Sequence, residues 1–308
     1  MSLPFLQPYF GLSNSLQTAQ GGAGGGASPT RGVFGGGSIG AYTNVMDYIT
    51  IATTGNATDF GDLTVTRSYL AGCNSDVRGC FAGGYTGASS NVIDYITIAT
   101  TGNATDFGDL TVARYEIAGL NSDTRGVFGG GTSSNVMDYI TIATTGNATD
   151  FGDLLSATRG TGGVNTTTRG IYGGGNTGSA TNVIQYITIA TTGNAIDFGD
   201  LTVARWNISG INSDVRGCFA GGYTGSNSNV IDYITMATLG NATDFGDLTA
   251  NKYDGGTANS LTRGTYAGGA TSYLSAIDYI TIATTGNATS FGNLSVGREG
   301  MPGVQNGL

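Results

Sequence analysis

The sequence has no histidine, and only 12 of its 308 residues are basic. Without histidine the chain has no Ser-His-Asp or Cys-His catalytic group and no zinc, copper or iron site built on imidazole. Charged residues make up 11% of the chain, against about 25% in ordinary soluble domains. The net charge is -9 and Lys252 is the single lysine. Because phosphate affinity comes mainly from basic side chains, we expect no binding to nucleic acid.

Signals for export and membrane insertion are also missing. The first basic residue is Arg31, so the N-terminus has no positively charged region of the kind that opens a secretory signal peptide. No apolar stretch approaches the 18 or so residues that a membrane-spanning helix needs. Of the three cysteines (Cys73, Cys80 and Cys218), the last two occupy one repeat position, where other copies carry Val33, Val127, Ile171 and Thr265. We therefore expect buried free thiols, no membrane insertion and synthesis in a reducing host cytoplasm.

The sequence is rich in glycine and in internal repeats. Glycine accounts for 55 residues. Because 39% of the residues are hydrophobic, which is enough for a packed core, the glycine content indicates neither collagen nor a disordered chain. An Arg-Gly step followed by an aromatic residue and glycines recurs six times, at spacings of 47, 47, 44, 47 and 47. Each copy continues into a variant of NVMDYITIATTGNATDFGDLTVAR, as at residues 44–67. The repeat therefore decides the architecture.

One copy of the repeat reads as four strands, expected at residues 114–123, 125–131, 135–144 and 148–155. The third is rich in β-branched and aromatic residues, which suit strands. A Gly-Asn step separates the third and fourth, and an Asn-Ser-Asp run separates the first and second; both are typical of tight turns. Four antiparallel strands per 47 residues or so is the unit of a β-propeller. A β-helix is the second choice, because its rungs are usually half as long.

The repeats resemble those of the kelch family in the glycine pair of the second strand, the Asp-Tyr of the third and the aromatic residue followed by leucine in the fourth. Kelch repeats usually carry tryptophan where this chain has Phe60, Phe107, Phe151, Phe198, Phe245 and Phe291. The resemblance implies an all-β, six-bladed kelch-like β-propeller. The near-identical copies of the sequence TGNATDFGDL follow an apolar N-terminal segment, LPFLQPYFGL. In this respect the chain is also similar to structural proteins of tailed bacteriophage particles. That similarity implies a fibre, spike or capsid appendage of the virion.

These patterns divide the chain into three parts. Residues 1–19 form an extended apolar peptide, residues 20–30 a glycine-rich linker, and residues 31–308 the propeller. The segment 299–307 keeps the register of an inner strand, so we expect it to close the first blade. An uncharged apolar peptide left in water is an aggregation hazard. We therefore expect the peptide to dock on other virion proteins, through Phe5, Leu6, Tyr9 and Phe10.

The basic residues recur at two positions of each copy. Six arginines precede the second strand, and a second set follows the fourth strand: Arg67, Arg114, Arg159, Arg205, Lys252 and Arg298. An aspartate of the third strand recurs as well, at Asp47, Asp94, Asp138, Asp232 and Asp278, with Gln185 as the exception. Such regularity favours buried pairs of a cation and an aspartate over a ring of phosphate or sulfate clamps.

Two other patterns predict no metal site. Asp59-Phe60-Gly61 and its copies match the magnesium motif of kinases in letters only, since no Walker loop, strand lysine or catalytic loop accompanies them. Asp59 with Asp62 lacks the alternating oxygen spacing of a calcium-binding EF-hand loop. We expect neither a metal nor a cofactor.

The loops on one end of the predicted propeller differ from copy to copy, whereas TTGNAT on the other end hardly changes. The variable loops are rich in Tyr, Ser, Gly and Asn, a composition typical of recognition surfaces on rigid scaffolds. Neutral drift on an unconstrained surface is the alternative. Retained aromatic residues favour binding, and they form the candidate ligand site: Tyr42, Tyr69, Tyr85, Tyr115, Trp206, Tyr223, Tyr253 and Tyr273.

The preferred function is therefore a non-enzymatic virion protein, present in multiple copies per particle, that attaches to a host-surface glycan. A neighbouring virion protein is the other candidate ligand, and a cytosolic kelch-like adaptor is the rival function. A glycan-cleaving enzyme would need carboxylates that break the repeat, and the chain offers Glu116, Asp254 and Glu299. We expect no catalytic residues.

Overall fold

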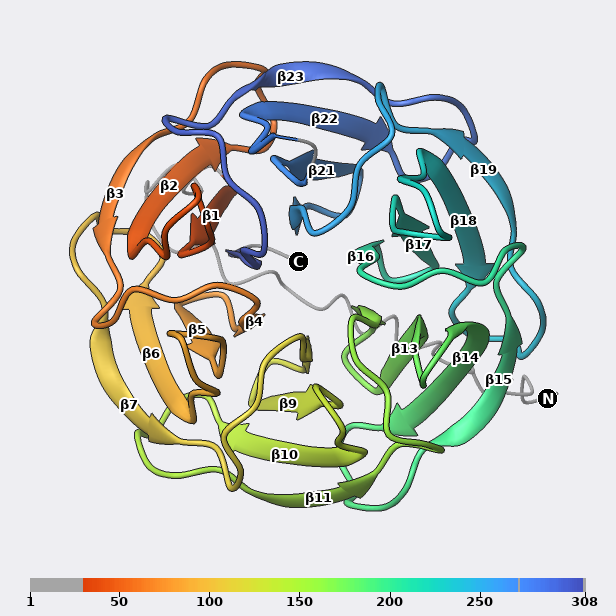
Figure 1. The fold of residues 1–308 in the computed structure, drawn as a ribbon, viewed down its shortest axis with the longest axis horizontal. Coiled ribbons are helices and arrows are strands. Elements are labelled where there is room, and N and C mark those ends of the chain that lie inside the picture. The colour runs from red at the N-terminus through yellow and green to blue at the C-terminus, as the bar shows by residue number, and fades with distance from the viewer. Residues whose placement is uncertain (1–29, 271, 307–308) are drawn as a thin grey trace, which may run out of the picture.

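The computed structural model describes residues 30–270 and 272–306, which form six four-stranded antiparallel sheets arranged in a ring (Figure 1). Within these residues there is no helix, and so none that could cross a membrane. The predicted all-β, six-bladed propeller is confirmed. The expected apolar peptide with Phe5, Leu6, Tyr9 and Phe10, and nearly all of the expected linker, lie outside the described residues.

Each blade runs from an inner strand beside the central axis to an outer strand at the rim (Figure 1). Blades one to three consist, from inside to outside, of β24 (Gly303–Gln305), β1 (Arg31–Gly35), β2 (Val45–Thr50) and β3 (Thr58–Asp62); β4 (Ala71–Asn74), β5 (Arg78–Ala82), β6 (Val92–Thr97) and β7 (Thr105–Asp109); β8 (Ala118–Asn121), β9 (Arg125–Gly129), β10 (Val136–Thr141) and β11 (Thr149–Asp153). Blades four to six consist of β12 (Gly162–Asn165), β13 (Arg169–Asn176), β14 (Ala180–Thr188) and β15 (Ile196–Asp200); β16 (Ser209–Asn212), β17 (Arg216–Ala220), β18 (Val230–Thr235) and β19 (Thr243–Asp247); β20 (Gly256–Asn259), β21 (Arg263–Ala267), β22 (Ala276–Thr281) and β23 (Thr289–Asn293).

The ring is closed by the C-terminal strand. β24 pairs antiparallel with β1, with Val304 opposite Val33, so strands from both ends of the propeller sequence share one sheet. The pairing begins at Gly303 rather than at residue 299, because Glu299 and Gly300 belong to the connection from blade six. This mixed blade joins the two ends of the ring without an exposed edge strand at the seam.

The inner strands are shorter than the sequence pattern indicates. In blade three the first strand was expected at residues 114–123, but β8 covers only Ala118–Asn121. Glu116 has a φ of 56°, a left-handed conformation that cannot continue a strand. A residue in the same left-handed conformation precedes every inner strand, and these six residues are hydrogen-bonded to one another around the axis.

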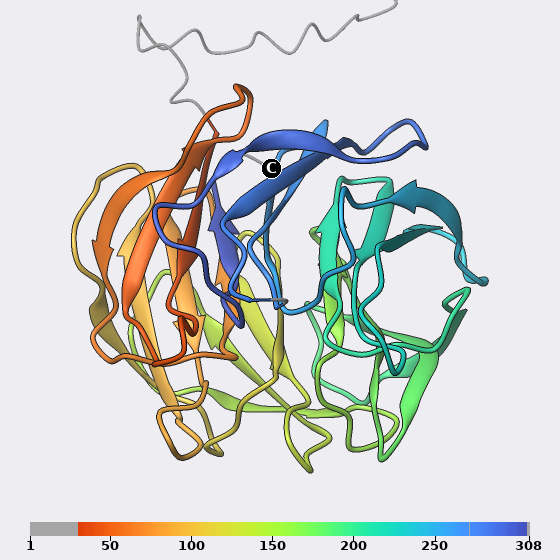
Figure 2. The same ribbon diagram turned by 45° about the horizontal axis from the view of Figure 1, so that its top comes forward.

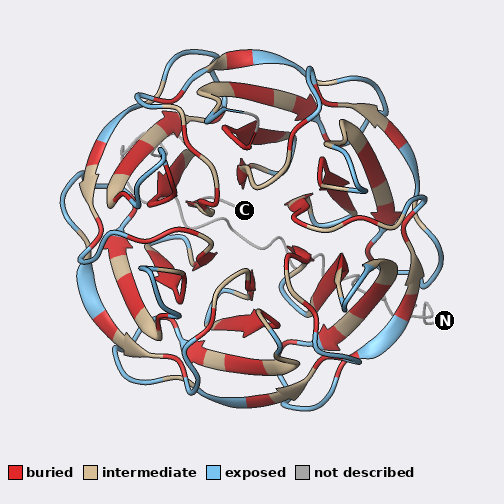
Figure 3. Ribbon diagram, viewed as in Figure 1, coloured by how far each residue is buried: buried red, intermediate tan, exposed pale blue. Residues whose placement is uncertain are grey.

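Neighbouring blades pack face to face through six apolar clusters, each of which takes residues from two blades. One cluster contains Val33, Met46 and Phe60 of blade one together with Phe81 and Ile96 of blade two, all buried. Figure 3 shows the result as mostly buried middle strands and partly exposed outer ones. The three cysteines lie in such clusters and are free and buried, as the sequence predicted.

The constant TTGNAT turns have a packing role. In blade two, the N–H groups of Gly102 and Ala104 donate to Phe60 O and Asp62 O of blade one, and Asn103 Oδ1 accepts from Asp62 N. The turn thus pairs alongside the outer strand of the preceding blade. Its constancy between copies follows from this contact, because each turn must fit the same partner.

Five cations of the second basic set form buried ion pairs with the recurring aspartates, as predicted. Arg67 lies 2.7 Å from Asp94, with both side chains fully buried. The equivalent pairs join Arg114 to Asp138, Arg205 to Asp232, Lys252 to Asp278 and Arg298 to Asp47. Each aspartate also accepts a hydrogen bond from a hydroxyl of the preceding blade, as Asp94 does from Thr64, so the pair links two blades.

The sequence alignment of the copies was wrong at Arg159. In blade four, Thr158 is the buried residue at the position of Arg114, and Arg159 is one residue further along, 36% exposed. Gln185 replaces the aspartate of this blade and accepts from Leu155 N at 2.8 Å. Both members of the pair are therefore neutral here, which leaves no buried charge without its partner.

The first basic set does not pair with aspartates. The guanidinium of Arg78 lies 4.2 Å from the ring centroid of Tyr95, and its Nη1 donates to Ile142 O of the next blade at 2.8 Å. The other five arginines of this set stack on the equivalent tyrosines in the same way. A ring and a neighbouring carbonyl together satisfy each cation, so these residues are structural rather than anion clamps.

Candidate functional site

The connections between blades and the loops between second and third strands lie at the same end of the ring, because successive strands are antiparallel; Figure 2 shows the connections gathered at the two ends. We call this end the variable face. It contains the loops that begin after β1, β3 and their equivalents. The bridge between Ser68 and Tyr85 shows how a blade connection and a loop pair side by side there.

Aromatic side chains form one cluster around blade two. The rings of Tyr42 and Tyr85 meet edge to face at a centroid distance of 5.6 Å, and those of Tyr85 and Tyr115 lie 4.9 Å apart. Tyr69 is 6.5 Å from Tyr115. All four are partly or well exposed. The structure thus brings four of the eight predicted ligand residues together.

A second cluster surrounds blade five, three blades away and hence on the opposite side of the ring. Tyr223 lies between Trp206, at 5.8 Å, and Tyr253, at 5.6 Å. Tyr273 is not in either cluster. It is 39% exposed and lies beside Gly40 of blade one, on the loop between β21 and β22. The face therefore carries two aromatic clusters on opposite sides of the axis.

The blade connections meet at the axis in a closed ring of backbone hydrogen bonds, which we call the axial ring. Its members donate N–H to the preceding carbonyl around the circle at 2.6–3.2 Å: Tyr69, Glu116, Gly160, Asn207, Asp254 and Gly300. All six have φ between 53° and 64°. Holding residues other than glycine in this conformation costs about 1–2 kcal/mol each. The ring fixes the positions of four polar side chains around the axis.

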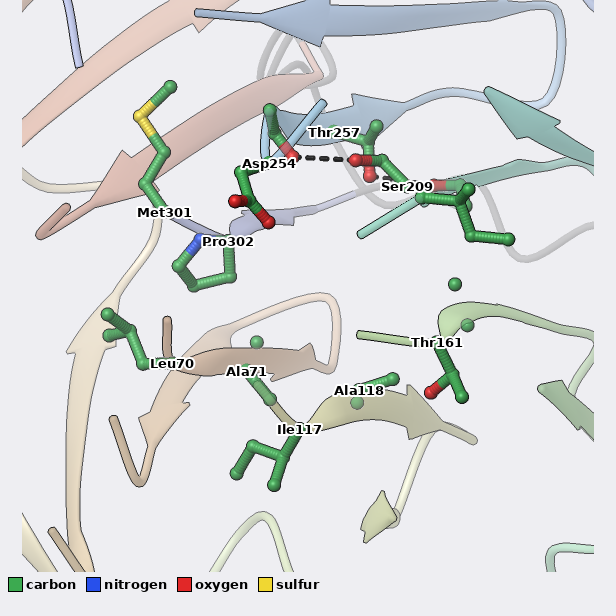
Figure 4. Close-up of a pocket in the computed structure, with 18 of the residues that line it drawn as sticks. Leu70, Ala71, Ile117, Ala118, Thr161, Ser209, Asp254, Thr257, Met301 and Pro302 are labelled. Atoms are coloured by element: carbon green, nitrogen blue, oxygen red, sulfur yellow. Dashed lines mark hydrogen bonds between the residues drawn. The ribbon is translucent and has the colours of Figure 1, made fainter. Parts of the chain in front are cut away.

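A cavity of about 140 Å³ runs along the axis from the axial ring toward the far ends of the inner strands (Figure 4). A ring of amides lines its other end: Asn74, Asn121, Asn165, Asn212, Asn259 and Gln305. Side-chain amides of this ring bond the backbone of a neighbouring inner strand; for example, Asn259 Nδ2 donates to the Asn212 carbonyl at 2.8 Å. The volume is enough for several waters or one small polar group.

Two carboxyl groups, Glu116 and Asp254, line the cavity at the variable face, and a third, Glu299, contacts the lining residue Tyr69. Asp254 accepts from Asn207 Nδ2 at 2.8 Å, and Glu299 accepts from the Tyr69 hydroxyl at 3.4 Å. Glu116 pairs with Arg159 at 3.3 Å. No group of three acidic or cysteine side chains in residues 30–270 and 272–306 is arranged to hold a metal ion.

All three carboxyl groups have raised pKa values. Burial, followed by the charges of Glu116 and Glu299, holds the pKa of Asp254 well above its usual range, and the bond from Asn207 only partly offsets this. Burial also raises the pKa of Glu116 and of Glu299. Burial and the charges of all three raise the pKa of the Tyr69 hydroxyl. The carboxyl groups at the axis therefore favour their protonated forms more than free carboxyl groups do.

Sequence reasoning found these carboxylates as residues that break the repeat, without a basis for placing them together. It did not find Asn207, Thr161 or the axial ring. One signal was present: the second residue after each buried cation, or after Thr158 in blade four, reads Tyr, Glu, Gly, Asn, Asp and Gly around the ring. Gly, Asn and Asp are the residues that most readily adopt a left-handed backbone.

No protein-family model matches this sequence, and no curated protein matches it significantly. The assignment of the propeller fold is therefore based on the six sheets themselves. A six-bladed propeller with a variable loop end fits a recognition or binding module.

Replacing Asp254 by asparagine should raise the melting temperature at neutral pH and leave it unchanged in acid. The pKa of an unfolded aspartate is about 3.9, and folding raises it here. The folded protein thus holds a proton that the unfolded chain releases, so stability falls as the pH rises above about 4. Asparagine removes that loss and keeps an acceptor for Asn207. Melting curves over a pH series check this, with Asp76→Asn on an exposed turn as the control. A variant less stable than the parent at neutral pH would contradict it.

Proposed function

We propose that the protein is a structural component of a tailed bacteriophage particle that attaches to host-surface glycan through the variable face. The observation that carries the proposal is the gathering of seven of the eight predicted aromatic residues into two clusters on that face. Tyrosine and tryptophan rings stack on the apolar faces of sugars and lose little conformational entropy on binding. The rigid axial ring holds the connections that bear several of them.

Three further features support a glycan. The loops between the aromatic residues supply serine, asparagine and backbone amides for sugar hydroxyls. The opposite end of the ring is constant because its turns pair with neighbouring blades, which leaves the variable face as the recognition surface. A net charge of -9 disfavours polyanionic ligands. Weak binding at single sites would be strengthened by multiple copies on one particle.

Replacing Trp206 and Tyr253 by alanine should reduce adsorption of particles to host cells at least about tenfold, a change of roughly 1.4 kcal/mol in binding. Both side chains are partly exposed on the variable face, so the melting temperature should change little. Adsorption assays with the variant particles measure the effect.

The matched control is Leu239→Ala, an exposed residue on the turn between β18 and β19 at the other end of the ring. Adsorption that survives the aromatic replacements but is lost in the Leu239 variant would contradict the proposal, because recognition would then lie at the end opposite the variable face. Mass spectrometry of purified particles against host cytosol separates the virion protein from a cytosolic kelch-like adaptor.

A further inference from the structure

We propose that the variable face binds an ammonium group at the axis, and that the glycan it takes is an amino sugar chain with free amines. The inference rests on the proposed function and specifies its ligand. The binding group, which we call the axial cup, consists of five residues that line the cavity (Tyr69, Glu116, Thr161, Asn207 and Asp254) together with Glu299, which accepts a hydrogen bond from Tyr69.

The first reason is that two of the three carboxyl groups at the axis have no cationic partner in the described part of the chain. Among the described residues only Glu116 of the three carboxylates has a cationic partner, and that contact is long, at 3.3 Å. Asp254 and Glu299 are supported only by the amide of Asn207 and the hydroxyl of Tyr69. A carboxylate withdrawn from water without a cation is costly. An incoming cation would lower that cost and let both residues ionise.

The second reason is the presence of buried acceptors that have no donor. Asn207 Oδ1 and Thr161 Oγ1 are without hydrogen-bond partners, in side chains that line the cavity and are only 5% and 6% exposed. Figure 4 shows the Thr161 hydroxyl and the Asp254 carboxylate around the same space. An ammonium group offers three donors and no acceptor, which matches a cup of acceptors. No three acidic groups in the part of the chain that the structure describes are arranged for a metal ion, so an organic ammonium is the cation that we propose.

The third reason is the aromatic surroundings. Trp206 already holds a cation over its ring, the Arg159 guanidinium at 5.2 Å. Tyr69 belongs to the cup itself, and Tyr253 precedes Asp254 in the chain. Rings of this kind attract ammonium groups through their electron-rich faces.

The two aromatic clusters lie on opposite sides of the cup, around blades two and five. A linear chain crossing the axis therefore stacks sugar rings on both clusters and presents an amine between them. This arrangement favours a polymer of hexosamine units over a single sugar.

The test compares two oligosaccharides of equal length, a glucosamine oligomer and an N-acetylglucosamine oligomer, by calorimetry with the full chain at about pH 6, where an aliphatic amine is protonated. We expect the glucosamine oligomer to bind at least about tenfold more tightly. The double variant Asp254→Asn, Glu299→Gln should bind both oligomers equally. Asp76→Asn with Asp123→Asn, two exposed acids on turns at the opposite end, is the charge-matched control and should keep the preference.

The outcomes separate the two proposals. Equal affinity for both oligomers, lost in the Trp206 and Tyr253 variant, overturns the amine and keeps the glycan. Binding of a lysine-rich peptide but of neither oligomer overturns the glycan and makes the ligand a protein. No binding of any of the three probes overturns the axial cup, while the adsorption assay still tests the proposed function. If the double variant fails to fold, Glu299→Gln alone and competition by methylammonium make the same comparison.

Discussion

Replacing Asp94 by glutamine is expected to lower the free energy of unfolding by about 3–5 kcal/mol, because it leaves a buried cation without its counter-charge. Asp94 and Arg67 are both fully buried and lie 2.7 Å apart. The guanidinium of Arg67 would retain only the carbonyls of Phe81, Gly83 and Val92 as acceptors. Chemical denaturation followed by circular dichroism measures the loss.

Blade four supplies the control for this prediction within the same chain. Its equivalent residues are Thr158 and Gln185, a neutral pair in the same buried place. The double variant Arg67→Thr, Asp94→Gln copies that pair and should be more stable than Asp94→Gln alone, with a coupling energy of about 0.5–3 kcal/mol. A double variant that loses as much as the sum of the two single changes would show that the pair has no mutual dependence.

The fold could be predicted from the sequence because every copy of the repeat contains the same signals for strands, turns and buried pairs. Every copy supplies strand-forming residues, a Gly-Asn turn and an apolar third strand, and the buried pairs follow from the recurrence of a cation and an aspartate. The exception was also informative. Gln185 signalled a changed partner, and the shift of Arg159 could have been found from spacing, because the cation stands four residues after Leu110 in blade three whereas the residue four after Leu154 is Thr158.

The candidate site was only partly predictable, for a different reason. The aromatic residues were recognisable because they recur in loops that otherwise vary. The axial cup depends on six connections meeting at one point, a geometry that no single copy contains. Glu116 and Asp254 are 138 residues apart in the chain and become neighbours only when the ring closes. Differences between copies at one repeat position were therefore the signal, and their position on the axis was the missing fact.

Adding a methyl group to the glycines that face the axis should have the other large effect. A Cβ on Gly119 would lie 2.0 Å from Gly72 O, and one on Gly210 would lie 1.9 Å from Gly163 O. These contacts are between the inner strands of neighbouring blades, so relief requires the blades to move apart. We expect each replacement by alanine to lower the free energy of unfolding by about 1–3 kcal/mol. The two sites lie at different blade interfaces, and their effects should add in the double variant.

Gly55→Ala is the matched control for these replacements, since no atom lies within 4 Å of the Cβ it would add, and it should change stability by no more than about 0.5 kcal/mol. Thr257 shows that a side chain at this position does not destabilise every blade interface. It occupies the same position in blade six, and its hydroxyl donates to Gly210 O at 2.6 Å, so β16 and β20 leave room for a side chain that the other interfaces exclude. If Gly119→Ala and Gly210→Ala melt at the temperature of the Gly55 variant, the inner strands can separate freely. The propeller would then be held together by its outer packing and its buried ion pairs rather than by close contact at the axis.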